Sequence, residues 1–207
     1  MNDATSKFAS ALIAISLIGG TWFLVRAFMH PIAQPEHATV LPSPMDLPDF
    51  TLDDQDGNAF TRGSLKGSWS LLFFGFTHCP DICPTTMQIL AATRDKMAAQ
   101  GLADSVLPKI VLISVDPERD TTDILKSYVS YFGKDIVGLT GDMSELKKLT
   151  KGLGIFFEKS PTDGGYNVDH TAAVLVVNPN AAFHAVFSAP HSIDSLIHDL
   201  PLILASK

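Results

Sequence analysis

Apolar and polar positions follow two alternating patterns along most of this chain. Continuous apolar runs of strand length are typical of strands buried on both faces of a sheet, and they cover 69–76 (WSLLFFGF), 109–116 (KIVLISVD) and 136–140 (IVGLT). Apolar residues recur at helical spacing in 83–100, 121–132, 142–154 and 192–205. This alternation of strands and helices predicts an α/β domain with a largely parallel central sheet.

Two further pairs of strands are predicted from turn signals. Residues 49–60 indicate a hairpin around Asp56-Gly57, and residues 171–187 indicate two strands around 178–180 (NPN). The late hairpin would add antiparallel strands to the sheet. The order of a strand, a loop, a helix and a late hairpin is that of a thioredoxin-like domain with a central mixed sheet.

The first part of the chain has a different character. Residues 8–25 contain no charge and are about long enough to cross a hydrocarbon core as a helix. We therefore expect an N-terminal transmembrane helix and anchor in residues 1–28, with a cleaved signal peptide as the alternative. Five prolines in residues 29–48 predict an extended tether. The folded domain is then expected to span residues 49–207.

Composition excludes several classes of function. The chain of 207 residues has a net charge of −7 and no basic run, which argues against nucleic acid as a partner. GxGxxG, GxxxxGK[ST] and HExxH motifs are absent from the sequence, so dinucleotide, P-loop and zincin chemistry have no support. Its two cysteines are too few for a disulfide-stapled scaffold.

These two cysteines, Cys79 and Cys83, lie between the first long apolar run and the following helix. In an α/β sheet, ligands bind at the ends of the strands where such a loop lies. Cys83 falls at the predicted start of the helix, where unpaired N–H groups favour a thiolate, so we expect its pKa to be lowered. Pro80 and Pro84 stiffen the backbone around the pair.

The C-P-D-I-C spacing is one residue longer than the C-x-x-C of thioredoxins. It permits a disulfide and also leaves room for a metal ion between two sulfurs. Thiolates select soft ions such as Cu(I), and two thiolates with one imidazole would suit copper. His170 is the candidate imidazole because it immediately precedes a buried strand, and the adjacent Asp169 is a candidate to orient it. His78 and Met87 are weaker candidates, and a non-ligand loop histidine remains the alternative for His170.

The segments GFTHCPDICPTTM (75–87), VLISVDPERDT (111–121) and YNVDHTAAVLVVNP (166–179) together resemble the SCO/SenC family of copper-binding cytochrome oxidase assembly proteins. The resemblance extends from about Asp49 to the final helix. It implies a thioredoxin-like domain that binds one copper ion, as Cu(I) or Cu(II), through Cys79, Cys83 and His170.

The resemblance also implies partners and a location. The expected client is the binuclear copper site of cytochrome c oxidase subunit II, which would receive copper or have its cysteines reduced. Another periplasmic copper chaperone or a thioredoxin-like reductant are further expected partners. The chain would be anchored in a bacterial inner membrane with its soluble domain in the periplasm, and it would act as an assembly factor rather than an enzyme.

Three alternatives remain for the cysteine pair. A thiol–disulfide oxidoreductase would use Cys79 to attack a partner disulfide and Cys83 to resolve the mixed disulfide. A peroxidase would need a lone reactive cysteine, which a CxxxC pair does not match. A structural disulfide would explain oxidation but not the position at the end of a buried strand. His170 separates the first alternative from copper binding, because thiol exchange does not require it.

Overall fold

The computed structural model describes residues 20–22 and 34–205. The chain divides into two units, Met1–Gln34 and Pro35–Lys207. In the first unit, the three residues from Gly20 to Trp22 are helical, and most of the predicted anchor lies outside the described residues. No helix within 20–22 or 34–205 is both long and apolar enough to cross a membrane.

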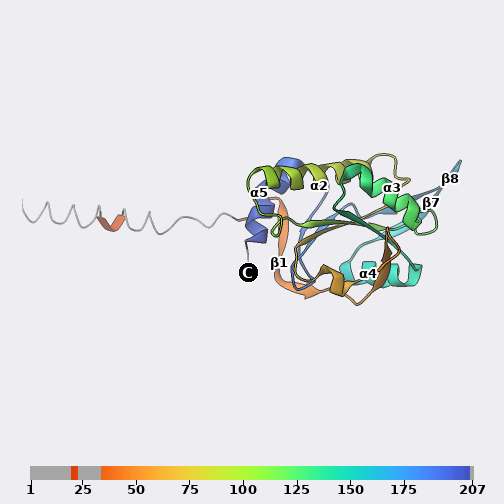
Figure 1. The fold of residues 1–207 in the computed structure, drawn as a ribbon, viewed down its shortest axis with the longest axis horizontal. Coiled ribbons are helices and arrows are strands. Elements are labelled where there is room, and N and C mark those ends of the chain that lie inside the picture. Colours follow the sequence, from red (N-terminus) through yellow and green to blue (C-terminus); the bar gives the residue numbers. More distant parts are fainter. Residues whose placement is uncertain (1–19, 23–33, 206–207) are drawn as a thin grey trace, which may run out of the picture. The chain divides into compact units, whose positions relative to one another are not determined.

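An eight-stranded mixed sheet forms the centre of the second unit (Figure 1). In spatial order its strands are β1 (Ala38–Asp46), β10 (Ala182–Phe187), β9 (Val174–Val177), β4 (Ser70–Gly75), β5 (Lys109–Ser114), β6 (Ile136–Thr140), β2 (Thr51–Asp54) and β3 (Ala59–Thr61). Strands β4, β5 and β6 are parallel, and the other pairings are antiparallel. The predicted mixed sheet of an α/β fold is therefore confirmed, but the expectation that it is largely parallel is wrong, since five of the seven pairings among its described strands are antiparallel.

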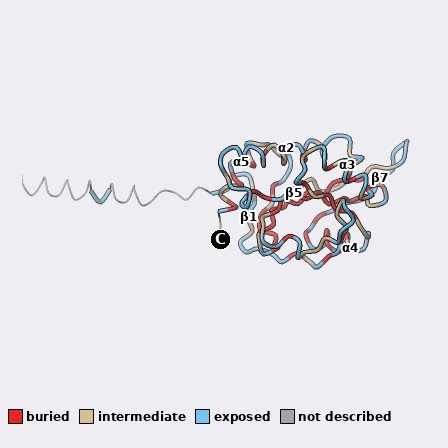
Figure 2. The backbone as a smooth tube through the Cα atoms, viewed as in Figure 1, coloured by how far each residue is buried: buried red, intermediate tan, exposed pale blue. Residues whose placement is uncertain are grey.

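Strand β4 lies near the middle of this sheet, and every one of its residues is buried. It pairs with β5 on one side and β9 on the other, as its uninterrupted apolar sequence predicts. Figure 2 shows the buried backbone concentrated along these central strands. The cysteine loop thus leaves the sheet from a central strand that is buried along its whole length.

Helices cover both faces of the sheet. They are α2 (Ile82–Ala99), α3 (Thr122–Phe132), α4 (Met143–Leu153) and α5 (Ile193–Leu204), with a short 3-10 helix η1 at Arg62–Leu65. Figure 1 shows α2, α3 and α5 on one face and α4 on the other. Their ends follow the sequence signals: the Thr121 hydroxyl accepts the N–H of Ile124 at the start of α3, and Gly154 adopts the left-handed conformation that ends α4.

The predicted tether is wrong over much of its length. Residues 38–46 form β1, an edge strand paired with β10, and Leu47 is only 1% exposed. Pro42 and Pro44 fall in the irregular stretch between Val40 and Met45 where the register shifts. Edge strands and bulges are where a sheet tolerates proline, because no ladder hydrogen bond is required of its nitrogen. The folded unit therefore begins before Asp49.

A second, two-stranded sheet was not anticipated from the sequence. Strands β7 (Phe157–Thr162) and β8 (Gly165–His170) form a hairpin that extends from the body of the domain in Figure 1. Their residues are mostly exposed or partly buried, so they lack the apolar run that identified the central strands. This hairpin carries His170 as its last residue, which corrects the prediction that His170 lies in a loop.

Candidate metal centre

The cysteine loop connects the end of β4 to the start of α2. The N–H of Cys79 donates to the carbonyl of Phe76 at 3.3 Å, which turns the chain directly after the strand. Cys83 lies in the first turn of α2, and its side chain is fully buried. Cys79 is partly exposed, so its sulfur is accessible from solvent, whereas the Cys83 sulfur lies on the buried side of the site.

Gly75, the last residue of β4, makes room for the buried sulfur. A Cβ at this position would lie 3.0 Å from Cys83 Sγ and 2.9 Å from a ring carbon of Phe73. Contacts this short would force the sulfur or the ring to move, because packed interiors leave little free space. The glycine in the GF pair after the apolar run is therefore needed by the site.

His170 approaches the cysteines from the end of β8. Its Nε2 lies 3.4 Å from Cys83 Sγ, and its Nδ1 lies 3.3 Å from the carbonyl oxygen of Thr171. A carbonyl can only accept, so Nδ1 carries the proton and the lone pair of Nε2 faces the sulfurs. The rings of Phe73 and Phe76 contact the imidazole edge-to-face at 6.1 and 5.9 Å between centroids, which fixes its orientation.

The three donor atoms of Cys79, Cys83 and His170 all lie within 4.8 Å of one another. This brings together the three residues that were predicted as ligands. Both cysteines are free thiols. Two sulfurs and one imidazole nitrogen form a donor set that fits a soft ion such as Cu(I), and Phe73 and Phe76 provide an apolar surround that limits water access.

The two thiols differ in acidity, in the opposite sense to the prediction. The pKa of Cys79 falls to about 3, chiefly because the Cys83 thiol donates a hydrogen bond to its sulfur, and in spite of partial burial. The pKa of Cys83 is raised, first because it is the donor in that bond and then because it is buried. The helix N-terminus stabilises the thiolate of Cys79 and not that of Cys83, because the N–H of Cys83 donates to Cys79 Sγ at 3.4 Å.

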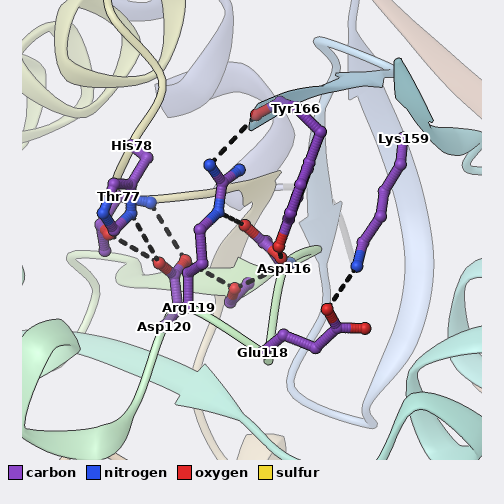
Figure 3. A network of polar contacts seen from close by, with 9 residues as sticks. Thr77, His78, Asp116, Glu118, Arg119, Asp120, Lys159 and Tyr166 are labelled. Atoms are coloured by element: carbon purple, nitrogen blue, oxygen red, sulfur yellow. Dashed lines mark hydrogen bonds and ion pairs between the residues drawn. The ribbon is translucent and has the colours of Figure 1, made fainter. Parts of the chain in front are cut away.

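A network of buried polar groups supports the cysteine loop (Figure 3). Asp120 is fully buried, and its carboxylate accepts the Thr77 N–H at 3.0 Å and the Thr77 hydroxyl at 2.6 Å. The same carboxylate accepts the hydroxyl of Ser114 at the end of β5 at 2.6 Å. The loop is thereby fixed two residues before Cys79.

The same network reaches the hairpin that carries His170. Buried Asp116 bonds to Arg119 and accepts the Tyr166 hydroxyl at 2.8 Å. Arg119 also donates to the Tyr166 carbonyl at 3.1 Å and stacks over its ring at 3.9 Å, and Figure 3 shows these side chains converging. Lys159 on β7 pairs with Glu118 at 2.6 Å. The segment 114–120 therefore contacts both halves of the site.

The remaining candidates lie outside the donor cluster. His78 is exposed, with Nδ1 3.0 Å from the Thr77 hydroxyl, and Met87 is a fully buried core residue. Asp169 is exposed, and the hydrogen bond of the His170 ring goes to Thr171 instead. His184 also lies outside the cluster, where it is buried with its ring against Trp69.

Sequence reasoning did not assign roles to Gly75, Thr77, Asp116, Arg119, Asp120 and Tyr166. The signal for the central part of this set was present as four charged residues (DPERD, 116–120) directly after a buried strand. Polar groups at that end of a parallel strand face the same edge as the cysteine loop. The long-range contact to Tyr166 had no local signal.

Comparisons with known proteins identify a family and solved structures that this chain resembles. The SCO1/SenC family model matches residues 43–205. A protein of Stutzerimonas stutzeri that is named for copper binding is 39% identical over 177 residues, which cover 81% of each chain. The fold is similar to that of Arabidopsis thaliana ScoI with copper bound (TM-score 0.68, 38% identity, 73% of this chain and 92% of that one).

A second solved structure extends the comparison to bacteria. Bradyrhizobium japonicum ScoI with copper bound has a TM-score of 0.67 and 37% identity, over 75% of this chain and 98% of that one. The matched family model covers β4, the cysteine loop and β8, and therefore the whole donor cluster. The chain belongs to the SCO1/SenC family.

Proposed function

We propose that this protein binds one copper ion through Cys79, Cys83 and His170 and supplies it to cytochrome c oxidase during assembly. The observation that carries the proposal is the convergence of two sulfurs and one imidazole nitrogen within 4.8 Å. The copper-bound relatives and the family membership support the choice of metal. The binuclear copper site of subunit II is the proposed client, because its cysteines could take the ion by exchange with Cys79 and Cys83.

The arrangement suits a site that must release its ion. Cys79 and His170 are partly exposed, so Cys79 is able to meet a partner's thiolate, whereas Cys83 is buried. We further propose that the first segment anchors the chain in a bacterial inner membrane with this domain in the periplasm, as the uncharged run at 8–25 and the family resemblance suggest.

Copper titration of the reduced full-length protein against a competing Cu(I) chelator tests the proposal. We expect one copper per chain, and we expect His170→Ala to lower the affinity at least tenfold because one of three ligands is lost. His78→Ala is the matched control, since His78 lies next to Cys79 but outside the donor cluster. Equal Cu(I) affinity in His170→Ala and the unmodified protein would remove His170 from the site.

A second candidate function, thiol–disulfide exchange, is favoured by the unequal acidity of the cysteines. Cys79 has the lowered pKa and the exposure of an attacking thiol, and the neighbouring Cys83 is placed to resolve a mixed disulfide. In such a step the Cys79 thiolate would attack a partner disulfide, form a mixed disulfide and release one partner thiolate. Cys83 would pass its proton to that thiolate, attack the Cys79 sulfur, form the Cys79–Cys83 disulfide and release the second partner thiolate. Reduction of a disulfide-bonded copper-site peptide, unaffected by His170→Ala, would support this function over copper delivery.

A further inference from the structure

A second group of metal-binding side chains lies where the segment before β1 meets helix α5. It consists of Glu36, His37 and His198, and their ligand atoms all lie within 4.8 Å of one another. All three side chains are exposed. The group shares no residue with the cysteine site, and the copper function proposed above makes no use of it.

Asp199 holds the three residues together. Its carboxylate is fully buried and accepts the backbone N–H groups of Glu36, His37 and Ala38 at 3.0, 2.6 and 2.7 Å. These bonds attach the segment that carries Glu36 and His37 to the helix that carries His198. The buried Asp199 carboxylate therefore holds the backbone of both segments in place and keeps the three exposed side chains close together.

The same carboxylate orients the His198 ring. Nδ1 of His198 lies 2.6 Å from Asp199 Oδ1, so Nδ1 carries a proton and Nε2 is the nitrogen left for a ligand. A histidine whose second nitrogen bonds to a carboxylate is the usual arrangement at metal sites, because it fixes the tautomer and the ring. The ring of His37 packs edge-to-face on that of His198, with centroids 5.7 Å apart.

We propose that Glu36, His37 and His198 bind a divalent transition-metal ion such as Zn²⁺ or Cu²⁺. Two imidazoles and one carboxylate are the ligands that these ions prefer, whereas Cu(I) selects the sulfurs of the other site. Ligand atoms around a tetrahedral zinc are about 3.4 Å apart, as bonds of about 2.0–2.1 Å require. Small side-chain rotations of these exposed groups would close the remaining gap, and water would complete the coordination.

The test is calorimetric titration of Zn²⁺ into the full-length protein. Zinc is used in place of Cu²⁺ because thiols do not reduce it. The protein carries Cys79→Ser, Cys83→Ser and His170→Ala, which remove the first site. We expect one zinc per chain, at least a tenfold loss of affinity in His37→Ala or His198→Ala, and a smaller loss in Glu36→Gln. His78→Ala and Glu158→Gln are the matched controls, because both residues are exposed and lie outside this group.

Thermal unfolding of each variant without metal separates lost ligands from lost structure. If the triple substitution prevents folding, the same titration is run on protein whose first site has been filled with Cu(I). Zinc uptake that depends on both histidines in either background supports the proposal. Absence of zinc uptake, or a zinc affinity in His37→Ala and His198→Ala equal to that of the protein that keeps both histidines, overturns it.

Discussion

At the scale of single residues, the unequal environments of the two cysteines determine what each can do. Cys79 precedes α2, and its sulfur accepts the N–H of Cys83 in the position of a helix cap, while the side chain of Asp81, the N-cap residue, makes no capping bond. Cys83 lies one turn further, buried against Gly75. The thiolate therefore forms on Cys79, the residue that solvent and partners can reach.

The acidity of Cys79 predicts its reactivity with pH. A thiol with a pKa of about 3 is already deprotonated at pH 5, so its alkylation rate by iodoacetamide should be nearly constant from pH 5 to 8. An ordinary thiol would react about ten times faster for each unit in that range, because its pKa is near 8.5. Mass spectrometry of the metal-free reduced protein measures the rate at Cys79.

The control for this experiment is Cys83→Ala, which removes the thiol that donates to the Cys79 sulfur. The pKa of Cys79 should then rise, and the alkylation rate should increase with pH. A rate that rises tenfold per unit in the unmodified protein would show that Cys79 is not the stabilised thiolate.

The sequence identified the three donor residues but not the groups that hold them. Cys79 and Cys83 could be found because few side chains bind soft metals and the pair follows a buried strand, whereas His170 precedes a buried strand and was assigned through the resemblance to the SCO/SenC family. The acidity of the pair could not be predicted, since it depends on which sulfur faces the N–H group of residue 83. That direction is set by the turn at Phe76, which the sequence pattern does not specify.

At the scale of elements, the site depends on a hairpin that contributes little to the core. Strands β7 and β8 pair with each other and not with the main sheet. The contacts that attach them to the body of the domain include Arg119 with the Tyr166 carbonyl, the Tyr166 hydroxyl with buried Asp116, and Lys159 with Glu118. We infer that these contacts determine how firmly His170 is held beside the cysteines.

Tyr166→Phe tests this role of the hairpin contacts. It removes the hydroxyl that donates to the Asp116 carboxylate and keeps the aromatic ring over Arg119. We expect a loss of about 1.5 kcal/mol in the free energy of unfolding, since hydrogen bonds to charged groups contribute about that much. Urea denaturation measures this loss. Hydrogen exchange in β7 and β8 should be faster in Tyr166→Phe than in the unmodified protein, and the central strands should be less affected than the hairpin.

Tyr131→Phe is the matched control, because Tyr131 is 85% exposed on α3. It should change stability by less than about 0.5 kcal/mol. Unchanged exchange in the hairpin of Tyr166→Phe would show that the Asp116 contact does not hold β8.

The central elements were predictable because their patterns are strong, and the hairpin was not because its pattern is weak. Strand β4 is an unbroken apolar run, and α2 ends at Ala99, two residues before Gly101, whose φ is positive, so local sequence and tertiary position agree. In β7 and β8 the stabilising contacts are long-range polar ones from 116–120. Such contacts leave no hydrophobic period in the hairpin itself.

At the scale of the whole molecule, the boundary of the folded unit lies earlier than the proline content suggests. The unit begins at Pro35, and β1 completes one edge of the sheet by pairing with β10. Asp199 binds the backbone at the start of β1, so three of the hydrogen bonds to its buried carboxylate form only when residues 36–38 are present. The prolines predict a tether because the sequence does not reveal that they lie in an edge strand with a single neighbour.

Two truncated chains test where the folded unit begins. A chain starting at Pro35 retains β1 and should unfold in urea as cooperatively as the full-length protein.

A chain starting at Asp49 loses β1 and the buried Leu47 side chain and leaves Asp199 without three donors. We expect it to lose at least about 4 kcal/mol, because burying a leucine contributes about 2 kcal/mol and unsatisfied buried groups cost about 1–3 kcal/mol each. That loss is a large share of the 5–15 kcal/mol typical of a domain, so much of this chain should be unfolded in water. Equal urea midpoints for the two chains would instead show that residues 35–48 add nothing to the fold.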